Sequence, residues 1–188
     1  MPMVEFVWWP GTDAFLSDLE NVISATVAHI SSAPGCLRIF YGLEEEDRTK
    51  FWMIVVWQSH AHHQAMMDSP DYALMVGRLR PYFGGELKMN HVEFVHGEGP
   101  AFGAPITTIS FLKSTKDSGG DEVDETLKSL TKSSGAVGAT WGQTQEDASL
   151  KIGIFGSEMD ESHPSSSFLV DSNVETIHVR FKEVFVAE

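Results

Sequence analysis

Two ionisable side chains in one short apolar stretch have the types and spacing of an acid–base pair. His91 and Glu93 lie two residues apart in a run that reads as a β-strand, so both would point to the same face. We expect that face to line a barrel, with Val92 and Phe94 facing helices. An imidazole beside a carboxylate can take a proton from a phenol or an activated methylene. The alternative is a hydrogen-bonded structural histidine, with Glu93 paired to Arg180 across an internal interface.

Aromatic and charged residues of the first half form a set of candidate ligand contacts. The aromatic excess is concentrated on predicted strands, and flat rings stack on flat apolar ligands. Glu5 shares a strand face with Trp9, and burying a carboxylate on that face is costly, which makes Glu5 a candidate for a functional role. Arg38 would hold an anionic or enolate oxygen, unless it is a charge at the edge of a sheet. The predicted substrate contacts are Glu5, Trp9, Arg38, Phe40, Trp52 and His62; the alternative for the aromatic residues is core packing.

Metal and cofactor motifs lack supporting spacing. His60, His62 and His63 have no carboxylate at helical spacing from two of them, so we expect a solvated helix start, with His62 or His63 at a cavity mouth as the alternative. The single cysteine, Cys36, excludes an intrachain disulfide and a site with several cysteine ligands. There is no glycine-rich phosphate loop and no nucleophile elbow. The sequence therefore predicts no metal and no organic cofactor.

The charge of the chain limits its partners. The formal net charge is −14, which repels nucleic acid and anionic membrane surfaces. No apolar run approaches the roughly 18 residues of a membrane span, and residues 1–5 lack the features of a signal peptide. We therefore expect a cytoplasmic protein whose partner is a hydrophobic small molecule. The acidic run over residues 44–47 is predicted to be a solvated hairpin tip.

Part of the chain is repeated. Each half closes with a strand that begins in histidine, His91 in the first and His178 in the second. By strand parity, His178, Arg180 and Lys182 would also point into the barrel. Shared ancestry or a shared structural demand explains the repeat. The matching positions are Gly35 with Gly135, Tyr41-Gly42 with Trp141-Gly142, and Glu46-Asp47 with Glu146-Asp147.

Apolar periodicity and turn residues predict the same order of elements in both halves. The first half should have a strand over 4–9, a helix from Thr12 or Asp13 to Pro34-Gly35, a hairpin over 36–43 and 51–57, a helix over 61–80 broken at Ser69-Pro70, and a strand over 87–95. The second should have a strand over 106–112, a helix over 121–133, strands over 136–143 and 150–156, a shortened helix over 159–173, and a strand over 174–185.

This order predicts an α+β chain of two fused ferredoxin-like βαββαβ halves, over residues 1–97 and 106–188, with a linker over 98–105. Each half covers one face of its sheet with helices and leaves the other face open. Two open apolar faces in one chain would close on each other as an intramolecular barrel. We expect this pseudo-dimer to hold one working cavity, mainly in the first half. Further pairing into a homodimer through an edge strand stays open.

Several segments together resemble a known family. They are Val56-Trp57-Gln58-Ser59, the run Met67 to Tyr72, Arg80-Pro81-Tyr82 and His91-Val92-Glu93-Phe94. These segments resemble the antibiotic-biosynthesis monooxygenase family of the dimeric α/β-barrel superfamily, over most of residues 3–96. Residues 105–186 resemble a diverged second copy, as in tandem members. The resemblance implies a superfamily of cofactor-free oxygenases of aromatic polyketides, polyketide cyclases, haem-degrading oxygenases, dehalogenase-like proteins and stress-response proteins, among which the fold does not choose.

Individual positions narrow this choice. Haem-degrading relatives carry a tryptophan and a haem-ligating histidine where this chain has Met66 and Val76, so haem degradation is disfavoured. A plant polyketide cyclase of the superfamily places a catalytic histidine where Tyr72 stands and its partner tyrosine where Met66 stands, so the same acid–base pair cannot operate here, although Tyr72 is a candidate phenolic donor. The predicted catalytic residues are thus His91, Tyr72 and Glu93. We expect a cofactor-independent monooxygenase acting on an aromatic or polyketide-like molecule; the alternatives are a cyclase or isomerase using the same base, and a non-catalytic binding or stress-response protein.

Overall fold

The computed structural model describes residues 2–95, 99–113, 125, 137–157 and 174–187. The predicted helices over 121–133 and 159–173 lie outside these residues, except for Glu125, which is helical. No helix in the described part of the chain is long and apolar enough to cross a membrane.

The first half contains the predicted elements in the predicted order, except that the single helix expected from Thr12 or Asp13 to Pro34-Gly35 is two helices, because Asp18 has a non-helical backbone (φ −136°, ψ 33°). They are β1 (Met3–Pro10), α1 (Asp13–Ser17), α2 (Leu19–Ser31), β2 (Cys36–Leu43), β3 (Lys50–Trp57), α3 (His60–Met67), α4 (Tyr72–Leu79), a 3-10 turn (Arg80–Tyr82) and β4 (Lys88–Val92). Thr12 caps α1, since its hydroxyl accepts a hydrogen bond from the backbone N–H of Phe15 at 3.3 Å. The helix predicted over 61–80 is broken at Ser69-Pro70, as expected.

The second half repeats the strand framework. Its elements are a 3-10 turn (Ala101–Gly103), β5 (Ile106–Lys113), β6 (Val137–Gln143), β7 (Leu150–Ser157), β8 (Val174–Val179) and β9 (Lys182–Val186). The sheets run β4-β1-β3-β2-β9 and β6-β7-β5-β8. Apart from β9, each has the same order, with the closing strand beside the first and the hairpin on the other side. The α+β fold of two ferredoxin-like halves is confirmed.

One prediction about the closing strand is wrong. The strand expected over 174–185 is two strands: β8 pairs with β5 in the second sheet, and β9 pairs with β2 in the first, with Ile39 opposite Phe185. Lys182 therefore belongs to the first sheet, where its Nζ donates to Glu20 Oε1 at 2.6 Å. Arg180 lies in the connection and pairs with Glu45 at 3.3 Å. The chain changes sheets because the edge of β2 offers unpaired backbone groups.

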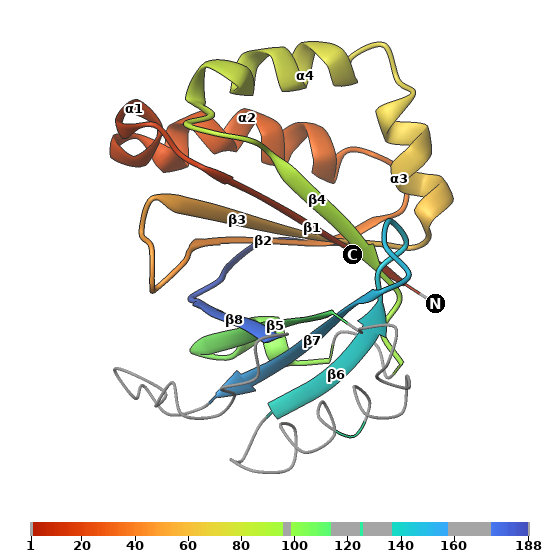
Figure 1. Cartoon of the computed structure of the whole chain (residues 1–188). Coiled ribbons are helices and arrows are strands. Elements are labelled where there is room, and N and C mark those ends of the chain that lie inside the picture. Colours follow the sequence, from red (N-terminus) through yellow and green to blue (C-terminus); the bar gives the residue numbers. More distant parts are fainter. Residues whose placement is uncertain (1, 96–98, 114–124, 126–136, 158–173, 188) are drawn as a thin grey trace.

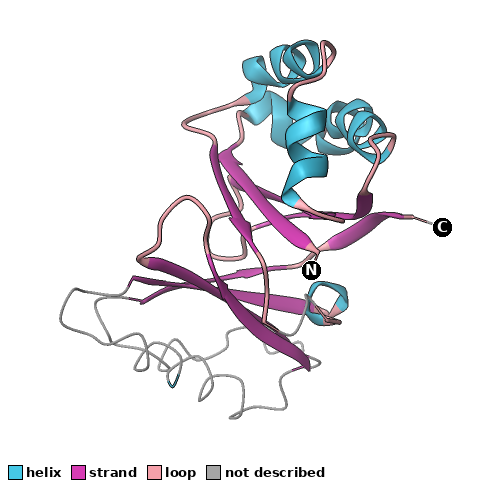
Figure 2. Cartoon of the chain, turned by 90° about the vertical axis from the view of Figure 1, so that its right-hand side faces the viewer, coloured by secondary structure: helices cyan, strands magenta, loops and turns pink. Residues whose placement is uncertain are grey.

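The molecule has two hydrophobic cores, one on each face of the first sheet. Helices α1–α4 cover one face of this sheet, and the second sheet packs against the other (Figures 1 and 2). The helix-side core includes Trp9, Phe15, Phe51 and Trp57. The inter-sheet core includes Phe6, Phe40, Trp52, Phe94 and Phe102, all at most 2% exposed. Phe102 comes from the predicted linker, so that segment also contributes to the core between the sheets.

Two reciprocal contacts, which we call the clasps, join the halves. In the first clasp, the backbone N–H of His91 donates to Glu146 Oε2 at 3.0 Å, and the ring Nδ1 contacts Glu146 Oε1. In the second clasp, His178 contacts Glu46 through the same two groups. The backbone N–H of Glu45 also donates to the carbonyl of His178 at 2.8 Å. The acidic run over 44–47 is therefore not a solvated tip: it holds the other half, and Glu44 is buried.

The repeated glycines have a matching explanation. A Cβ on Gly42 would lie 2.3 Å from the carbonyl oxygen of Arg180, and one on Gly142 would lie 2.4 Å from that of Glu93. Each glycine thus lets the chain that leaves the other half's closing strand pass against its own hairpin. The repeat of Tyr41-Gly42 in Trp141-Gly142 reflects the close approach that the clasps require.

Gly142→Ala should destabilise the protein by about 1–3 kcal/mol, the usual cost of forcing atoms into a packed contact. The matched control is Gly77→Ala on α4, where a Cβ meets nothing within 4 Å. Because alanine favours helix over glycine, the control should be neutral or stabilising by up to about 1 kcal/mol. Urea denaturation of both variants measures the difference, and equal shifts of the same sign would contradict the clasp geometry.

Candidate functional site

A buried polar cluster lies between α3 and the helix-covered face of the first sheet. Glu5 on β1 pairs in register with His91 on β4, which puts both side chains on the same face. His63 points toward them from α3, on the face of that helix that also buries Met66. Trp57 on β3 completes the cluster. Glu5 is 4% exposed, His63 0% and His91 5%.

The cluster forms a continuous row of polar contacts. Trp57 Nε1 donates to Glu5 Oε2 at 2.7 Å, and Glu5 Oε1 lies 3.5 Å from His63 Nε2. His63 Nδ1 is 2.7 Å from His91 Nε2, and His91 Nδ1 contacts Glu146 in the first clasp. We call Glu5, His63, His91 and Glu146 the polar row. It begins at a buried carboxylate and ends at Glu146, whose side chain is 38% exposed.

Burial sets the protonation of this row. Desolvation raises the pKa of Glu5 to about 7, against a hydrogen bond from Trp57 that lowers it. Desolvation lowers the pKa of His63 to about 4, with His91 and His60 adding in the same direction. Near neutral pH, Glu5 is therefore poised to hold or release a proton while His63 stays neutral.

Two further titratable groups, Tyr72 and Cys36, are affected by the charge of Glu5. Burial raises the pKa of Tyr72, and the charge of Glu5 raises it further, so the phenol keeps its proton. Burial also raises the pKa of the Cys36 thiol to about 12, again with a contribution from Glu5. Of the predicted catalytic residues, Tyr72 is thus close enough to Glu5 to sense its charge.

The predicted orientation of the closing strand is wrong. Val92 and Phe94 point into the inter-sheet core, and His91 faces the helices. Glu93 lies beyond the end of β4 and is exposed, and the carboxylate that contacts His91 is Glu146 from the other half. The difference has a physical cause. The space between the two sheets is packed with apolar side chains from both, so the apolar residues Val92 and Phe94 point into it and His91 points to the opposite face.

The predicted substrate contacts do not line a single cavity. Glu5 and Trp9 face the helices, where Trp9 packs on Phe15 and Phe51. Phe40 and Trp52 face the second sheet instead. Because alternate residues of a strand have opposite faces, these two pairs are separated by the sheet itself.

The two remaining predicted contacts lie outside the polar row. Arg38 pairs with Glu183 on β9 at 2.7 Å, and its guanidinium lies 4.6 Å from the centre of the Phe40 ring. His62 Nδ1 is 2.9 Å from the hydroxyl of Ser59. The His62 ring packs against Gly35, where a Cβ would lie 2.3 Å from His62 Cγ and where φ is +82°.

Sequence reasoning missed two members of the row. His63 was expected at a solvated helix start or a cavity mouth, yet it is fully buried. Its position three residues before the buried Met66 is the signal for an inward face of α3. Glu146 stands out in the sequence only through its place in the repeat. Its match with Glu46, combined with the match of His91 with His178, indicates a reciprocal contact.

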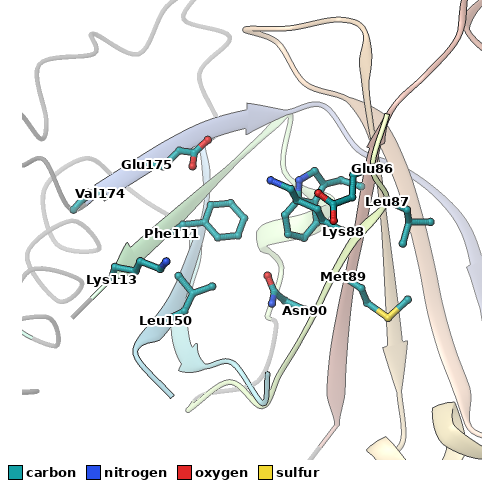
Figure 3. Close-up of a pocket in the computed structure, with 11 residues that line it drawn as sticks. Glu86, Leu87, Lys88, Met89, Asn90, Phe111, Lys113, Leu150, Val174 and Glu175 are labelled. Atoms are coloured by element: carbon teal, nitrogen blue, oxygen red, sulfur yellow. The ribbon is translucent and has the colours of Figure 1, made fainter. Parts of the chain in front are cut away.

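The described residues form hollows in places other than the single cavity expected in the first half. A cleft of about 630 Å³ lies between the halves, with side chains from β4, β5 and β8 around it (Figure 3). Its aromatic wall is Trp8, stacked on Trp52 at 4.6 Å between ring centres, with Phe111 at 5.7 Å from Trp8. A second hollow of about 590 Å³ lies between α2 and α4 and is lined by residues that include Thr26, Met75 and Tyr82.

Three members of the row also offer metal-ligand atoms. Ligand atoms of Glu5, His63 and His91 lie within 4.8 Å of one another, and all three residues are buried. However, His63 Nδ1 and His91 Nε2 are only 2.7 Å apart. Two nitrogens bound tetrahedrally to one zinc at about 2.0–2.1 Å would be about 3.3 Å apart. In this geometry these two nitrogens therefore form a hydrogen bond with each other and do not bind one zinc ion together.

The opposite pKa shifts of Glu5 and His63 predict the pH dependence of stability. The raised pKa of Glu5 means that the native state binds more protons than the unfolded state between about pH 4.5 and 7, so its contribution falls as pH rises. The lowered pKa of His63 makes its contribution rise between about pH 4 and 6.5. In the wild type, these two pH-dependent contributions to the free energy of unfolding largely cancel.

Glu5→Gln should remove the contribution of Glu5, which falls as pH rises. The free energy of unfolding of this variant, relative to that of the wild type, should rise by about 3 kcal/mol between pH 4 and pH 8. His63→Gln should do the reverse and leave a stability that falls with pH. Urea denaturation across this range measures both variants. Curves parallel to wild type would show that neither group is shifted.

Comparison with known proteins adds the family. Residues 11–78 match the family model described as antibiotic biosynthesis monooxygenase. The matched segment includes α3 with His63 and most of α4 with Tyr72. No curated protein sequence matches the chain significantly.

Solved structures share the whole two-half fold. An anthrone oxidase-like protein aligns over 97% of this chain and 92% of its own, with a TM-score of 0.66 and 9% identity. A candidate monooxygenase from Lactobacillus acidophilus aligns over 100% and 99%, with a TM-score of 0.63 and 12% identity. Another from Fusobacterium nucleatum aligns over 97% and 93%, with a TM-score of 0.63 and 10% identity. At these identities the likeness shows the fold alone. The chain thus matches the antibiotic biosynthesis monooxygenase family over residues 11–78 of its first half, and it shares the two-half fold of these solved structures.

Proposed function

We propose that this protein is a cofactor-independent monooxygenase that acts on a hydrophobic aromatic small molecule, with Glu5 as the proton acceptor. The observation that carries the proposal is the buried carboxylate of Glu5 in the helix–sheet layer of the first half, 3.5 Å from a neutral imidazole, with its charge acting on the phenol of Tyr72. A carboxylate in such surroundings is a functional candidate because burial without a full counter-charge costs stability. The family match supports a monooxygenase-type reaction, and the substrate class is part of the proposal.

The proposed reaction needs a substrate methylene made acidic by an aromatic ring and a carbonyl. Glu5 takes one C–H proton, and the resulting carbanion transfers electrons to O2 and combines with it as a peroxide. Loss of water from the peroxide converts the CH2 group into C=O. One oxygen atom ends in the ketone and the other in water, so the four electrons come from the substrate and no added reductant is required.

Tyr72 would act in this reaction as a hydrogen-bond donor. Its raised pKa keeps the hydroxyl protonated, so it can donate a hydrogen bond to a carbonyl oxygen that gains negative charge as the proton leaves. Trp57 holds the other oxygen of Glu5 at 2.7 Å, which orients Oε1 away from the indole. Base and donor would then act on the same enolate from one layer of the fold.

The test is oxygen uptake with a hydroxylated anthrone as the probe. Glu5→Gln keeps the size of the side chain and can still accept from Trp57, but it cannot take the proton, so kcat should fall by roughly 10²–10⁴-fold. Glu44→Gln is the matched control, because Glu44 is equally buried and accepts from Trp52 Nε1 at 3.1 Å on the other face of the sheet. It should stay within about threefold of wild type. Full activity of the Glu5 variant would refute this role.

The same assay separates a second candidate function. The space between the sheets is filled by buried aromatic side chains, which favours a non-catalytic binding protein with a closed core. In that case the probe would bind saturably and return unchanged, with no oxygen consumed. Consumption of the probe at an equal rate under nitrogen would instead indicate a cyclase or isomerase using the same base.

A further inference from the structure

The second half supplies one end of the polar row in the first half. We infer that Glu146 is a positioning residue that, through His91 and His63, gives the buried Glu5 a path for protons to solvent. This inference rests on the proposed role of Glu5 as the base. It assigns the second half a part in the chemistry of the first, beyond closing the barrel.

The burial of the row limits how Glu5 exchanges protons with solvent. Both C–H protons of the substrate end in the product water, so Glu5, which is 4% exposed, takes a proton from carbon and later delivers one to oxygen, and the row lets it exchange that proton with solvent in between. His63 and His91 are as deeply buried, and Glu146 is the first member of the row with substantial exposure, at 38% of its side chain. The row therefore joins the carboxylate in the core to one at the surface.

The hydrogen-bond partners indicate which ring nitrogen of each histidine carries the proton. Glu146 accepts the backbone N–H of His91, and as a carboxylate it also accepts a proton held on His91 Nδ1. His91 Nε2 is then an acceptor, so the bond of 2.7 Å to His63 places a proton on His63 Nδ1. His63 Nε2 is left as an acceptor 3.5 Å from Glu5 Oε1 and without a hydrogen-bond partner among the described residues, and a shortening of this contact lets it take the proton that Glu5 carries.

Transfer along the row moves one proton without creating a free charge. The Glu5 proton passes to His63 Nε2, the His63 Nδ1 proton passes to His91 Nε2, and the His91 Nδ1 proton passes to Glu146, which releases it to water. Both imidazoles end neutral in the other tautomer, and transfer in the reverse direction, which brings a proton from Glu146 back to Glu5 for the peroxide oxygen, restores them. A concerted transfer suits His63, because burial opposes its cationic form. Among the described residues, His60 contacts the row through the His91 ring, and Tyr72 and Cys36 interact with the charge of Glu5.

The second clasp provides an internal control. His178 makes the same backbone and ring contacts with Glu46 that His91 makes with Glu146. Among the described residues, no contact links His178 to Glu5 or His63. Glu46→Gln and Glu146→Gln should therefore weaken equivalent clasps, and only the second should affect the proton path.

The experiment compares these two variants of the full chain in the anthrone assay. Glu146→Gln should lower kcat at least tenfold with KM unchanged and should enlarge the solvent deuterium isotope effect on kcat. Glu46→Gln should change kcat less than threefold, although both variants should lower Tm alike. Formate should restore activity to Glu146→Ala and not to Glu5→Ala. Equal kcat for the Glu46 and Glu146 variants would overturn the inference, and if Glu5→Gln is inactive in the same series, the proposed function survives.

A second readout does not need turnover. In protein labelled with nitrogen-15 at histidine, exchange of the His63 ring proton with D2O should be at least tenfold slower in Glu146→Gln than in Glu46→Gln. Equal exchange in the two variants would overturn the relay whether or not the probe is oxidised.

Discussion

The two clasps are the contacts on which the rest of the molecule depends. Each sets a histidine of one half against a glutamate of the other, with backbone hydrogen bonds on both sides and a glycine that lets the chains approach. Bonds to charged groups are worth more than neutral ones, roughly 1.5–3 kcal/mol each. The clasps also explain why two distant dipeptides recur along the chain. Since one clasp is part of the polar row, the same contact closes the barrel and reaches the candidate base.

Local pattern was enough to predict most of the first half. The β2–β3 hairpin, a helix start at Thr12 or Asp13 and the break at Ser69-Pro70 follow from turn residues and apolar spacing, which act over a few residues. The internal repeat predicts the strands of the second half from the pattern of the first. The division of 174–185 into β8 and β9 could not be predicted this way, because it depends on an edge of a sheet formed far away in the sequence.

The site was harder to predict than the fold. Parity correctly put Glu5 and Trp9 on one face, but it does not say which face meets the helices, and that choice inverted the expected role of His91. The partners of His91 come from α3 and from the second half, and neither is near it in sequence. A single sequence shows which residues are polar on an apolar strand. It does not show which other chain segment satisfies them.

The pairing of β9 with β2 constrains the order in which the protein can be built. Arg38 and Glu183, which hold this pair at the edge, are 145 positions apart. During synthesis, β2 must therefore expose a free backbone edge until residues 182–186 have left the ribosome. Such an edge is a template for other strands, so the nascent first half should depend on a chaperone or on rapid synthesis of the rest. Insertions that delay the second half would then harm yield more than stability.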